Sequence, residues 1–339
     1  MKTASTGVES TYYGKPVIKA PHWRWLIITY FFCGGIAGAS FTIGTIANLV
    51  SRDRSVERAA RYLALAALIP CPPLLVLDLG RPERFLHMLR ILKLRSPMSL
   101  GSWALSGFGL FATLAAGLQL LSDVTRRDIP GLRRIIGILG LPFSVFLSGY
   151  TGILLAATNI PVWWRASPLL SPTFISSAYS TALAGITLIL ARVEQEPPPL
   201  PKRSRLRWVG RRRHPADVPR PGSTAQRLAR AEVICAATEI TFLTAILLRL
   251  GKIGRPLTTG RLGLIFWPVV YFGGLLTPLA LQLSGPVQGR PESVGRRRAG
   301  AMLTLVGGFA LRAVMIFAGR ESARRPEDYF AMTRKTSER

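Results

Sequence analysis

The sequence from Leu77 to Phe85 reads Leu-Asp-Leu-Gly-Arg-Pro-Glu-Arg-Phe, and it separates two long apolar runs. Asp78 comes one position before the end of the first run, Gly80 suits the end of a helix, and Pro82 suits the first turn of a new one. The stretch therefore predicts a helix end at a membrane edge, where a carboxylate meets two guanidinium groups. We expect chemistry at this edge.

The segment that follows predicts a short surface helix over residues 82–93. Its apolar residues recur at helical spacing with basic residues between them, which is typical of a helix lying on a membrane surface. These apolar residues are Phe85, Leu86, Met88, Leu89 and Leu92. After them, Ser96-Pro97-Met98-Ser99-Leu100-Gly101-Ser102-Trp103 leads into the next apolar run.

The whole chain has 339 residues, of which 49% are hydrophobic. Eight of its apolar runs are close to the ~20 residues that a helix needs to cross a bilayer. They are Trp25 to Val50, Ala59 to Leu79, Trp103 to Leu121, Ile135 to Ala157, Pro172 to Ala191, Ala231 to Leu250, Gly263 to Leu283 and Ala299 to Gly319. The sequence thus predicts an all-α membrane protein with eight transmembrane helices and no cleavable signal peptide before the first.

These runs divide the chain into five parts. They are a tail (1–24), helices 1–5 with the surface helix at 82–93 (25–192), a basic proline-rich linker (193–230), helices 6–8 (231–319) and a C-terminal tail (320–339). We expect the second helix to be interrupted by Pro70, Pro72 and Pro73, because proline removes a backbone donor and clashes with the preceding turn.

Residues that ligate metals are few and scattered. Cys33, Cys71 and Cys235 form no CxxC pair, and the three histidines His22, His87 and His214 form no pair within a span. We therefore expect no bound haem, iron-sulfur cluster or other metal in this chain. Motifs for phosphate binding, zinc hydrolysis or a nucleophilic serine are also missing from the sequence.

The net charge of +27 arises from 44 Lys and Arg against 17 Asp and Glu, almost all in the loops. In a chain with many spans, such charge favours contact with anionic lipid, and we expect no binding of nucleic acid. Lys and Arg are nearly balanced between the two sides, and the small excess reverses when the long linker is discounted. Charge alone therefore leaves the orientation open.

Ionisable groups also fall well inside two of the predicted spans, the sixth and the eighth. Glu239 lies near the centre of the sixth, and Glu232 precedes it by seven residues on the same helix face. A carboxylate at this depth costs ~2.5 to 3.5 kcal/mol on insertion scales, so it is either functional or a hydrogen-bonded structural group. Arg312 in the eighth helix either extends to the near membrane edge or pairs with Asp78 or another buried acid.

Several of these motifs resemble the NrfD-like family, the membrane subunits of polysulfide reductases. They are Tyr30 to Ala39, Leu77 to Phe85, Ser96 to Trp103, Tyr150-Thr151-Gly152 with Pro161-Val162-Trp163, and Leu311-Arg312 with Phe317-Ala318-Gly319. The resemblance runs from about Trp25 to Pro326. It implies eight helices arranged as two four-helix bundles, in a bacterial inner membrane protein without a bound cofactor of its own.

The resemblance also implies a function and a site. Members exchange electrons between a membrane quinone, menaquinone or ubiquinone, and an extracytoplasmic ferredoxin-like iron-sulfur subunit that often serves a molybdopterin oxidoreductase. In that family the loop matching Asp78 to Pro82 faces outside beside the quinone, which places both termini outside. The family's polar residues near the start of helix 1 and tyrosine in helix 4 correspond here to His22 and Tyr150. The long basic linker departs from the compact pattern of the family.

We therefore hypothesise a quinone-binding subunit in which Asp78 and His22 exchange protons with quinol. Arg81 or Arg84 would keep Asp78 ionised. Tyr150 and Trp103 would complete the quinone site with Arg81, and Glu239 would belong to an internal proton path. The chain alone would be either non-catalytic or the quinol-oxidising part of its complex.

Two alternatives stay open. One is a structural anchor that holds a redox partner without binding quinone. The other is a secondary transporter, because interrupted helices and buried charges are also found in transporters. The Asp78–Arg81 pair itself has a structural interpretation, as a salt bridge that fixes the turn after the second helix.

Overall fold

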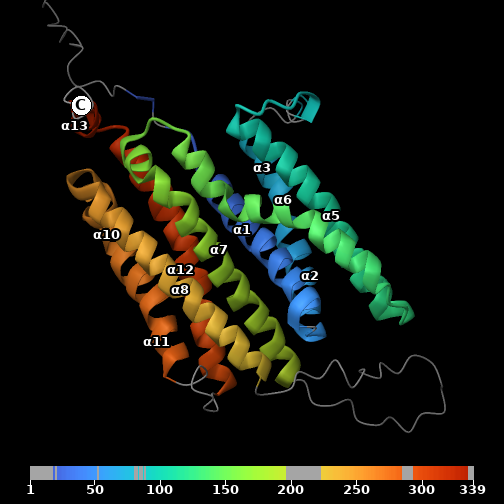
Figure 1. Ribbon diagram of the computed structural model, residues 1–339. Coiled ribbons are helices and arrows are strands. Elements are labelled where there is room, and N and C mark those ends of the chain that lie inside the picture. Colours follow the sequence, from blue (N-terminus) through green and yellow to red (C-terminus); the bar gives the residue numbers. More distant parts are fainter. Residues whose placement is uncertain are drawn as a thin grey trace, which may run out of the picture.

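A computed structural model shows the protein as a set of long helices packed side by side (Figure 1). It describes residues 18–19, 21–51, 53–79, 83, 87, 89–195, 223–284 and 293–334. Within these residues, eight helical segments are long and apolar enough to cross a membrane. The prediction of an all-α protein with eight spans is confirmed.

The helical elements of the described residues follow one another without a strand between them. They are α1 (Trp25–Ile46), η1 (Ala47–Ser51), α2 (Arg54–Leu68), α3 (Cys71–Asp78), α5 (Pro97–Thr125), α6 (Pro130–Ala156), α7 (Pro161–Gln195), α8 (Ser223–Leu250), η3 (Gly251–Gly254), α9 (Arg255–Thr258), α10 (Gly260–Ile265), η4 (Phe266–Leu276), α11 (Thr277–Leu283), α12 (Val294–Ser322) and α13 (Pro326–Arg334). The second span consists of α2 and α3, and the seventh of α10, η4 and α11.

Proline interrupts the second span as expected. α2 ends at Leu68, a turn follows at Ile69 and Pro70, and α3 begins at Cys71. The seventh span is irregular for a related reason, since η4 is a π-helical segment that contains Pro268. Such wide turns are rare and concentrate at functional sites. Both irregular spans thus carry backbone groups that need partners inside the protein.

Helix α7 occupies the middle of the molecule. It packs against α6, α1 and α2 on one side and against α8 and α12 on the other (Figure 1). Close approach relies on small residues, because the backbone at Gly38 of α1 lies against Ser144 and Ser148 of α6. Since α6 and α1 both join α7 directly, the predicted division into two four-helix bundles stays a prediction.

The alternating helices define two ends of the molecule. We call the end that carries Asp78, the starts of α1, α5 and α7 and the last turn of α12 the Asp78 end, and the opposite one the Asp53 end. All the tryptophans that the structure describes lie at the Asp78 end: Trp23, Trp25, Trp103, Trp163, Trp164 and Trp267. Tryptophan collects at membrane–water interfaces, so this belt marks an interface.

Some predicted boundaries are wrong. The fifth span begins at Pro161 rather than Pro172, because Pro168 and Pro172 are accommodated inside one continuous helix. α8 begins at Ser223, so the predicted linker 193–230 contributes helix at both of its ends. The expected C-terminal tail is helical as well, in the last turn of α12 and in α13.

The predicted surface helix lies mostly outside the described residues. His87, Leu89 and Arg90 are helical, whereas 91–93 are not.

A charged cluster that the sequence did not reveal joins the first four spans at the Asp53 end. The Glu57 carboxylate accepts hydrogen bonds from Arg61 Nε (2.9 Å) and Asn48 Nδ2 (3.0 Å), and Arg133 Nη1 lies 3.8 Å from the same oxygen. Arg133 also donates to the Gln119 amide oxygen (2.6 Å). Glu57, Arg61 and Arg133 are each at most 5% exposed, so η1, α2, α5 and α6 share one buried polar network.

Asp53 extends the contacts of this end to the second half of the chain. Its carboxylate caps α2 through the backbone N–H groups of Ser55 and Val56 and accepts a 2.5 Å hydrogen bond from the Thr224 hydroxyl in α8. Burial alone would raise the pKa of Asp53, but these hydrogen bonds and that of the Ser55 hydroxyl outweigh it and lower the pKa. Asp53 is therefore ionised at neutral pH and ties α2 to α8.

We predict that Glu57→Gln lowers the stability of the detergent-solubilised protein by about 3 kcal/mol, because it leaves the buried Arg61 without its carboxylate, while Arg133 keeps Asp128 at 3.3 Å. Thermal unfolding monitored by circular dichroism measures the change. Glu194→Gln is the control, since Glu194 pairs with Arg297 in a more exposed position and should cost less than about 1 kcal/mol. Equal losses in the two variants would contradict a structural role for the buried network.

Candidate functional site

Asp78 is the last residue of α3 and is half-buried at the Asp78 end. The break at Pro70 redirects the chain so that α3 packs along the start of α1. There the nearest basic influence on the Asp78 carboxylate comes from Arg24, which directly precedes α1. The expected cations Arg81 and Arg84 lie outside the described residues, so their pairing with Asp78 stays a prediction.

Tyr150 lies at the same end but is buried, at 5% exposure, in α6. Its hydroxyl donates to the carbonyl oxygen of Pro97 at the start of α5 (3.2 Å). Its ring is surrounded by aromatic side chains, with Phe31 edge-on at 6.4 Å and Phe146 at 5.8 Å between ring centroids. A phenol oxygen in this position still has lone pairs that can accept a hydrogen bond.

The two remaining predicted site residues are accessible. His22 is exposed before α1, and Trp103 is 40% exposed on the second turn of α5. The neighbouring Trp23 stacks on Trp163 of α7 at 5.3 Å, which fixes the chain just beside His22. The structure thus brings His22, Asp78, Trp103 and Tyr150 to one end of the molecule, while no hydrogen bond within the described residues joins any two of them.

A second group of polar side chains lies deep in the spans around α7. Glu239 of α8 is 2% exposed and its carboxyl faces the hydroxyl of Ser177, with Ser180 beside it. Arg312 of α12 donates through Nη1 to the same Ser177 hydroxyl oxygen (3.2 Å) and to the Gly308 carbonyl (2.8 Å). Ser177 therefore stands between an acid and a base that interact electrostatically.

Arg312 does not extend to the membrane edge, because its side chain is fully buried. Its guanidinium carbon lies 5.6 Å from the ring centroid of Phe32 and 5.7 Å from that of Phe174, distances at which a cation and a ring attract. Its Nε and Nη2 groups have no hydrogen-bond partner among the described residues. Of the predicted alternatives, the structure supports a buried acid, Glu239, as the counter-charge.

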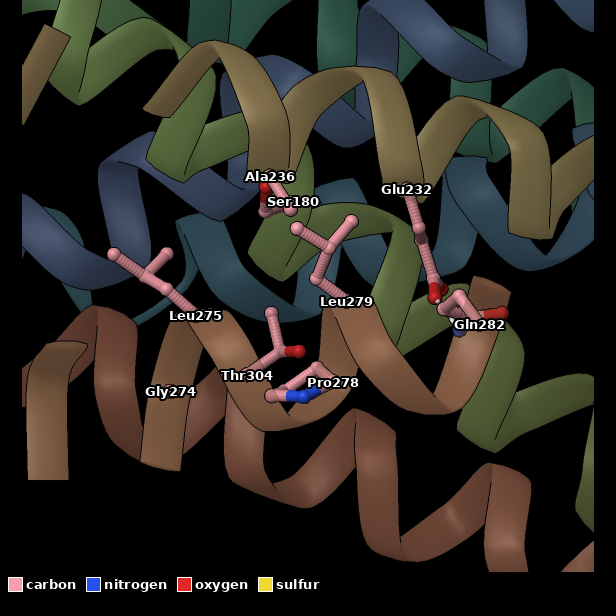
Figure 2. Close-up of a pocket in the computed structure, with 9 residues that line it drawn as sticks. All are labelled: Ser180, Glu232, Ala236, Gly274, Leu275, Pro278, Leu279, Gln282 and Thr304. Carbon is pink, nitrogen blue, oxygen red and sulfur yellow. Dashed lines mark hydrogen bonds between the residues drawn. The ribbon is translucent and has the colours of Figure 1, made fainter. Parts of the chain in front are cut away.

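A small cavity continues this polar region toward the Asp53 end (Figure 2). Ser180, Glu232, Gln282 and Thr304 supply its polar lining, and Ala236, Gly274, Leu275, Pro278 and Leu279 supply the rest. Glu232 accepts hydrogen bonds from the Thr187 hydroxyl (3.0 Å) and from the Gln282 amide. The free volume of about 10 Å³ corresponds to roughly one water molecule.

The cavity is lined by Glu232 and approaches Glu239 through Ser180. Ser180 lies beside Glu239 and also lines the cavity, yet its buried hydroxyl has no hydrogen-bond partner in the described structure. A water molecule bound there would satisfy Ser180 and reach Glu232. The result is a polar column from Glu232 through Ser180, Glu239 and Ser177 to Arg312.

Sequence reasoning found the carboxylates and Arg312 but missed their partners. Ser177 and Ser180 gave no signal, because serines inside a span usually bond to their own helix. Arg24 was overlooked as a tail residue, although it directly precedes the first span.

Among the described residues, no cluster of three or more His, Cys, Asp or Glu side chains could hold a metal.

The comparisons with known proteins agree with the architecture. Residues 17–210 match the family model described as Polysulphide reductase, NrfD. The protein is also similar to the C subunit of the polysulfide reductase of Wolinella succinogenes, with 24% identity over 328 residues, which covers 88% of this sequence and 94% of that subunit. The region that matches the family model contains Asp78 and Tyr150 but ends before Glu239 and Arg312.

We predict that Gly35→Ala destabilises the protein by about 1 to 3 kcal/mol, because a methyl group there would lie 2.9 Å from Arg312 Nη2 and 3.3 Å from Ala178. The guanidinium is held by Ser177 and Gly308, so it cannot withdraw freely. Gly109→Ala is the matched control, since its methyl group meets nothing within 4 Å and should be neutral or stabilising. The measurement is the thermal unfolding midpoint of each variant in the same detergent, which should be lower for Gly35→Ala than for Gly109→Ala. Equal midpoints would argue against tight packing between Gly35 and Arg312.

Proposed function

The chain belongs to the NrfD family of polysulphide reductase membrane subunits, and from this premise we propose that it binds quinone at the Asp78 end. As a family member it is a multi-pass membrane subunit of a respiratory oxidoreductase. We propose further that the Asp78 end faces outward in a bacterial inner membrane. There it would meet an iron-sulfur subunit, and through it a molybdopterin subunit.

The observation that carries the quinone proposal is the set of side chains that lie at the same end of the molecule as Asp78. A half-buried carboxylate ends the short helix α3 at an interrupted span, with Arg24 as its nearby cation. The Tyr150 hydroxyl and the exposed Trp103 ring lie at the same end. A proton acceptor, a phenol and a flat aromatic surface at a membrane interface suit the polar oxygens and the ring of a quinone head group.

When bound as quinol, the substrate supplies two electrons and two protons. Asp78 would accept a proton from a quinol hydroxyl through its carboxylate oxygens, and His22 would accept the other through an imidazole nitrogen. Tyr150 would orient the head group through its oxygen while its own hydroxyl proton stays directed at the Pro97 carbonyl. The electrons would leave to the iron-sulfur subunit docked at this end.

The charge of the Asp78 end supports docking of an acidic partner there. Its exposed described residues include a series of basic side chains, namely Arg90, Lys93, Arg95, Lys252, Arg255, Arg261 and Arg324. Opposite charges speed the encounter of two proteins and fix their orientation more than they add affinity.

We also propose that Glu239 belongs to a proton path within the spans. This second proposal rests on the polar column that runs from Glu232 to Arg312, in which the cavity provides room for a water between Glu232 and Ser180. Glu232 lies toward the Asp53 end, so the column would take up protons from that side.

We predict that Asp78→Asn lowers quinol-dependent turnover of the assembled complex by about a hundredfold, since the amide cannot accept the proton. Turnover is measured with a soluble quinol and the complex's own electron acceptor. Glu321→Gln serves as the control, because Glu321 is an exposed carboxylate at the same end that pairs with Arg325. Unchanged turnover in a correctly assembled Asp78→Asn complex would favour the structural anchor instead.

Glu239→Gln should separate proton uptake from quinol chemistry. We expect quinol turnover at the Asp78 end to stay within about threefold of wild type, whereas proton uptake from the Asp53 side falls by about a hundredfold because the amide cannot relay a proton. A pH-sensitive dye trapped in proteoliposomes reports the uptake. Glu194→Gln, at the same end but on the surface, should behave like wild type. Proton uptake by Glu239→Gln at the wild-type rate would exclude this path.

A further inference from the structure

A reciprocal arginine pair stands at the Asp78 end between α7 and α8. Arg165 Nε donates to the carbonyl oxygen of Arg249 (3.0 Å), and Arg249 Nε donates to the carbonyl oxygen of Arg165 (2.7 Å). Each side chain is therefore held against the backbone of the other, so the two cations cannot move apart. No carboxylate of the described residues lies within ion-pair distance of either guanidinium.

This arrangement is electrostatically unfavourable unless an anion joins it. Two like charges repel each other, and Arg165 also lies near the N-terminus of α7, where the helix dipole is positive. The Nε groups are used in the clamp, which leaves the Nη groups of both side chains able to donate outward. Guanidinium groups in this geometry bind phosphate oxygens in a bidentate manner.

Exposed apolar side chains adjoin the pair. Trp164 directly precedes Arg165 and is 45% exposed, and Leu248 directly precedes Arg249 and is 80% exposed. Arg165 follows the start of α7 by four residues and Arg249 is the penultimate residue of α8, so both lie where an apolar helix reaches the Asp78 end. Basic side chains at the ends of apolar helices are placed to meet the head groups of anionic lipids.

We infer that Arg165 and Arg249 form a binding site for the phosphate of an anionic phospholipid in the leaflet at the Asp78 end. The phosphate would lie between the two Nη pairs, and the acyl chains would run along Leu248 and Trp164 toward the membrane centre. The site lies between α7 and α8, away from Asp78 and Tyr150, so it goes beyond the proposed quinone chemistry and does not depend on it.

The test uses the purified full chain in detergent with added phosphatidylglycerol or phosphatidylcholine, followed by native mass spectrometry. We expect wild type to retain phosphatidylglycerol about tenfold better than phosphatidylcholine, and to lose this preference at high salt. This comparison needs no variant, so it stands even where a substitution disturbs folding. Equal retention of the two lipids by wild type would overturn the proposal.

Variants locate the site. Arg165→Gln/Arg249→Gln should reduce retention of phosphatidylglycerol about tenfold or more and leave phosphatidylcholine unchanged. Arg261→Gln removes an exposed charge at the same end and should change neither lipid. An equal loss in Arg261→Gln would show unspecific attraction by the basic surface and would overturn the site.

A charge-preserving variant tests the clamp. Arg165→Lys/Arg249→Lys keeps both cations but lacks the Nε–H that forms the clamp and the paired Nη donors, so we expect retention of phosphatidylglycerol between that of wild type and that of the glutamine variant. Full retention by the lysine variant would contradict the fork geometry. Full retention of phosphatidylglycerol by the glutamine variant would show that the pair serves another ligand, such as an acidic protein segment.

Discussion

The constraint on which the structure depends is that a charged group inside the spans must find its partners within the protein, because the hydrocarbon offers none. Arg312 shows how far this constraint reaches. It is fully buried in α12, yet it touches Ser177 and Phe174 of α7 and Phe32 of α1, and it interacts with Glu239 of α8. Four spans that are distant in sequence are thereby fixed around one side chain, which gives α7 its central place.

The same constraint acts at the Asp53 end with a different solution. There the Glu57 carboxylate accepts hydrogen bonds from Arg61 and Asn48 and lies within ion-pair distance of Arg133, so one carboxylate connects three helices. A buried ion pair is weak evidence for net stability, since desolvation offsets most of the attraction. Its value here is better understood as specificity, because Asn48 of η1, Arg61 of α2 and Arg133 of α6 all reach Glu57 in this register.

Local patterns were enough to predict the spans and the interruption at Pro70–Pro73, since apolar length and proline act within a few turns of their own helix. They failed at the start of α7, where Pro168 and Pro172 look like breaks in sequence but are held in a helix by tertiary contacts. They also failed for Glu57 and Arg61, which resemble ordinary loop charges until α6 supplies Arg133. Asp78 was predicted from the charged stretch at the end of an apolar run, Glu239 from its place inside a span, and the role of Tyr150 from the family resemblance, whereas Ser177, Ser180 and Arg24 look ordinary in sequence.

Helix α1 joins the two polar regions of the molecule. Phe31 packs edge-on against Tyr150 at the Asp78 end, and Gly35, one turn further along the same face, lies directly beneath Arg312. Because Gly35 has no side chain, the guanidinium and Ala178 approach the α1 backbone closely. Tight packing of this kind leaves little room for a larger residue at this position. Helix α1 therefore places the proposed quinone end and the polar column in the spans one helical turn apart.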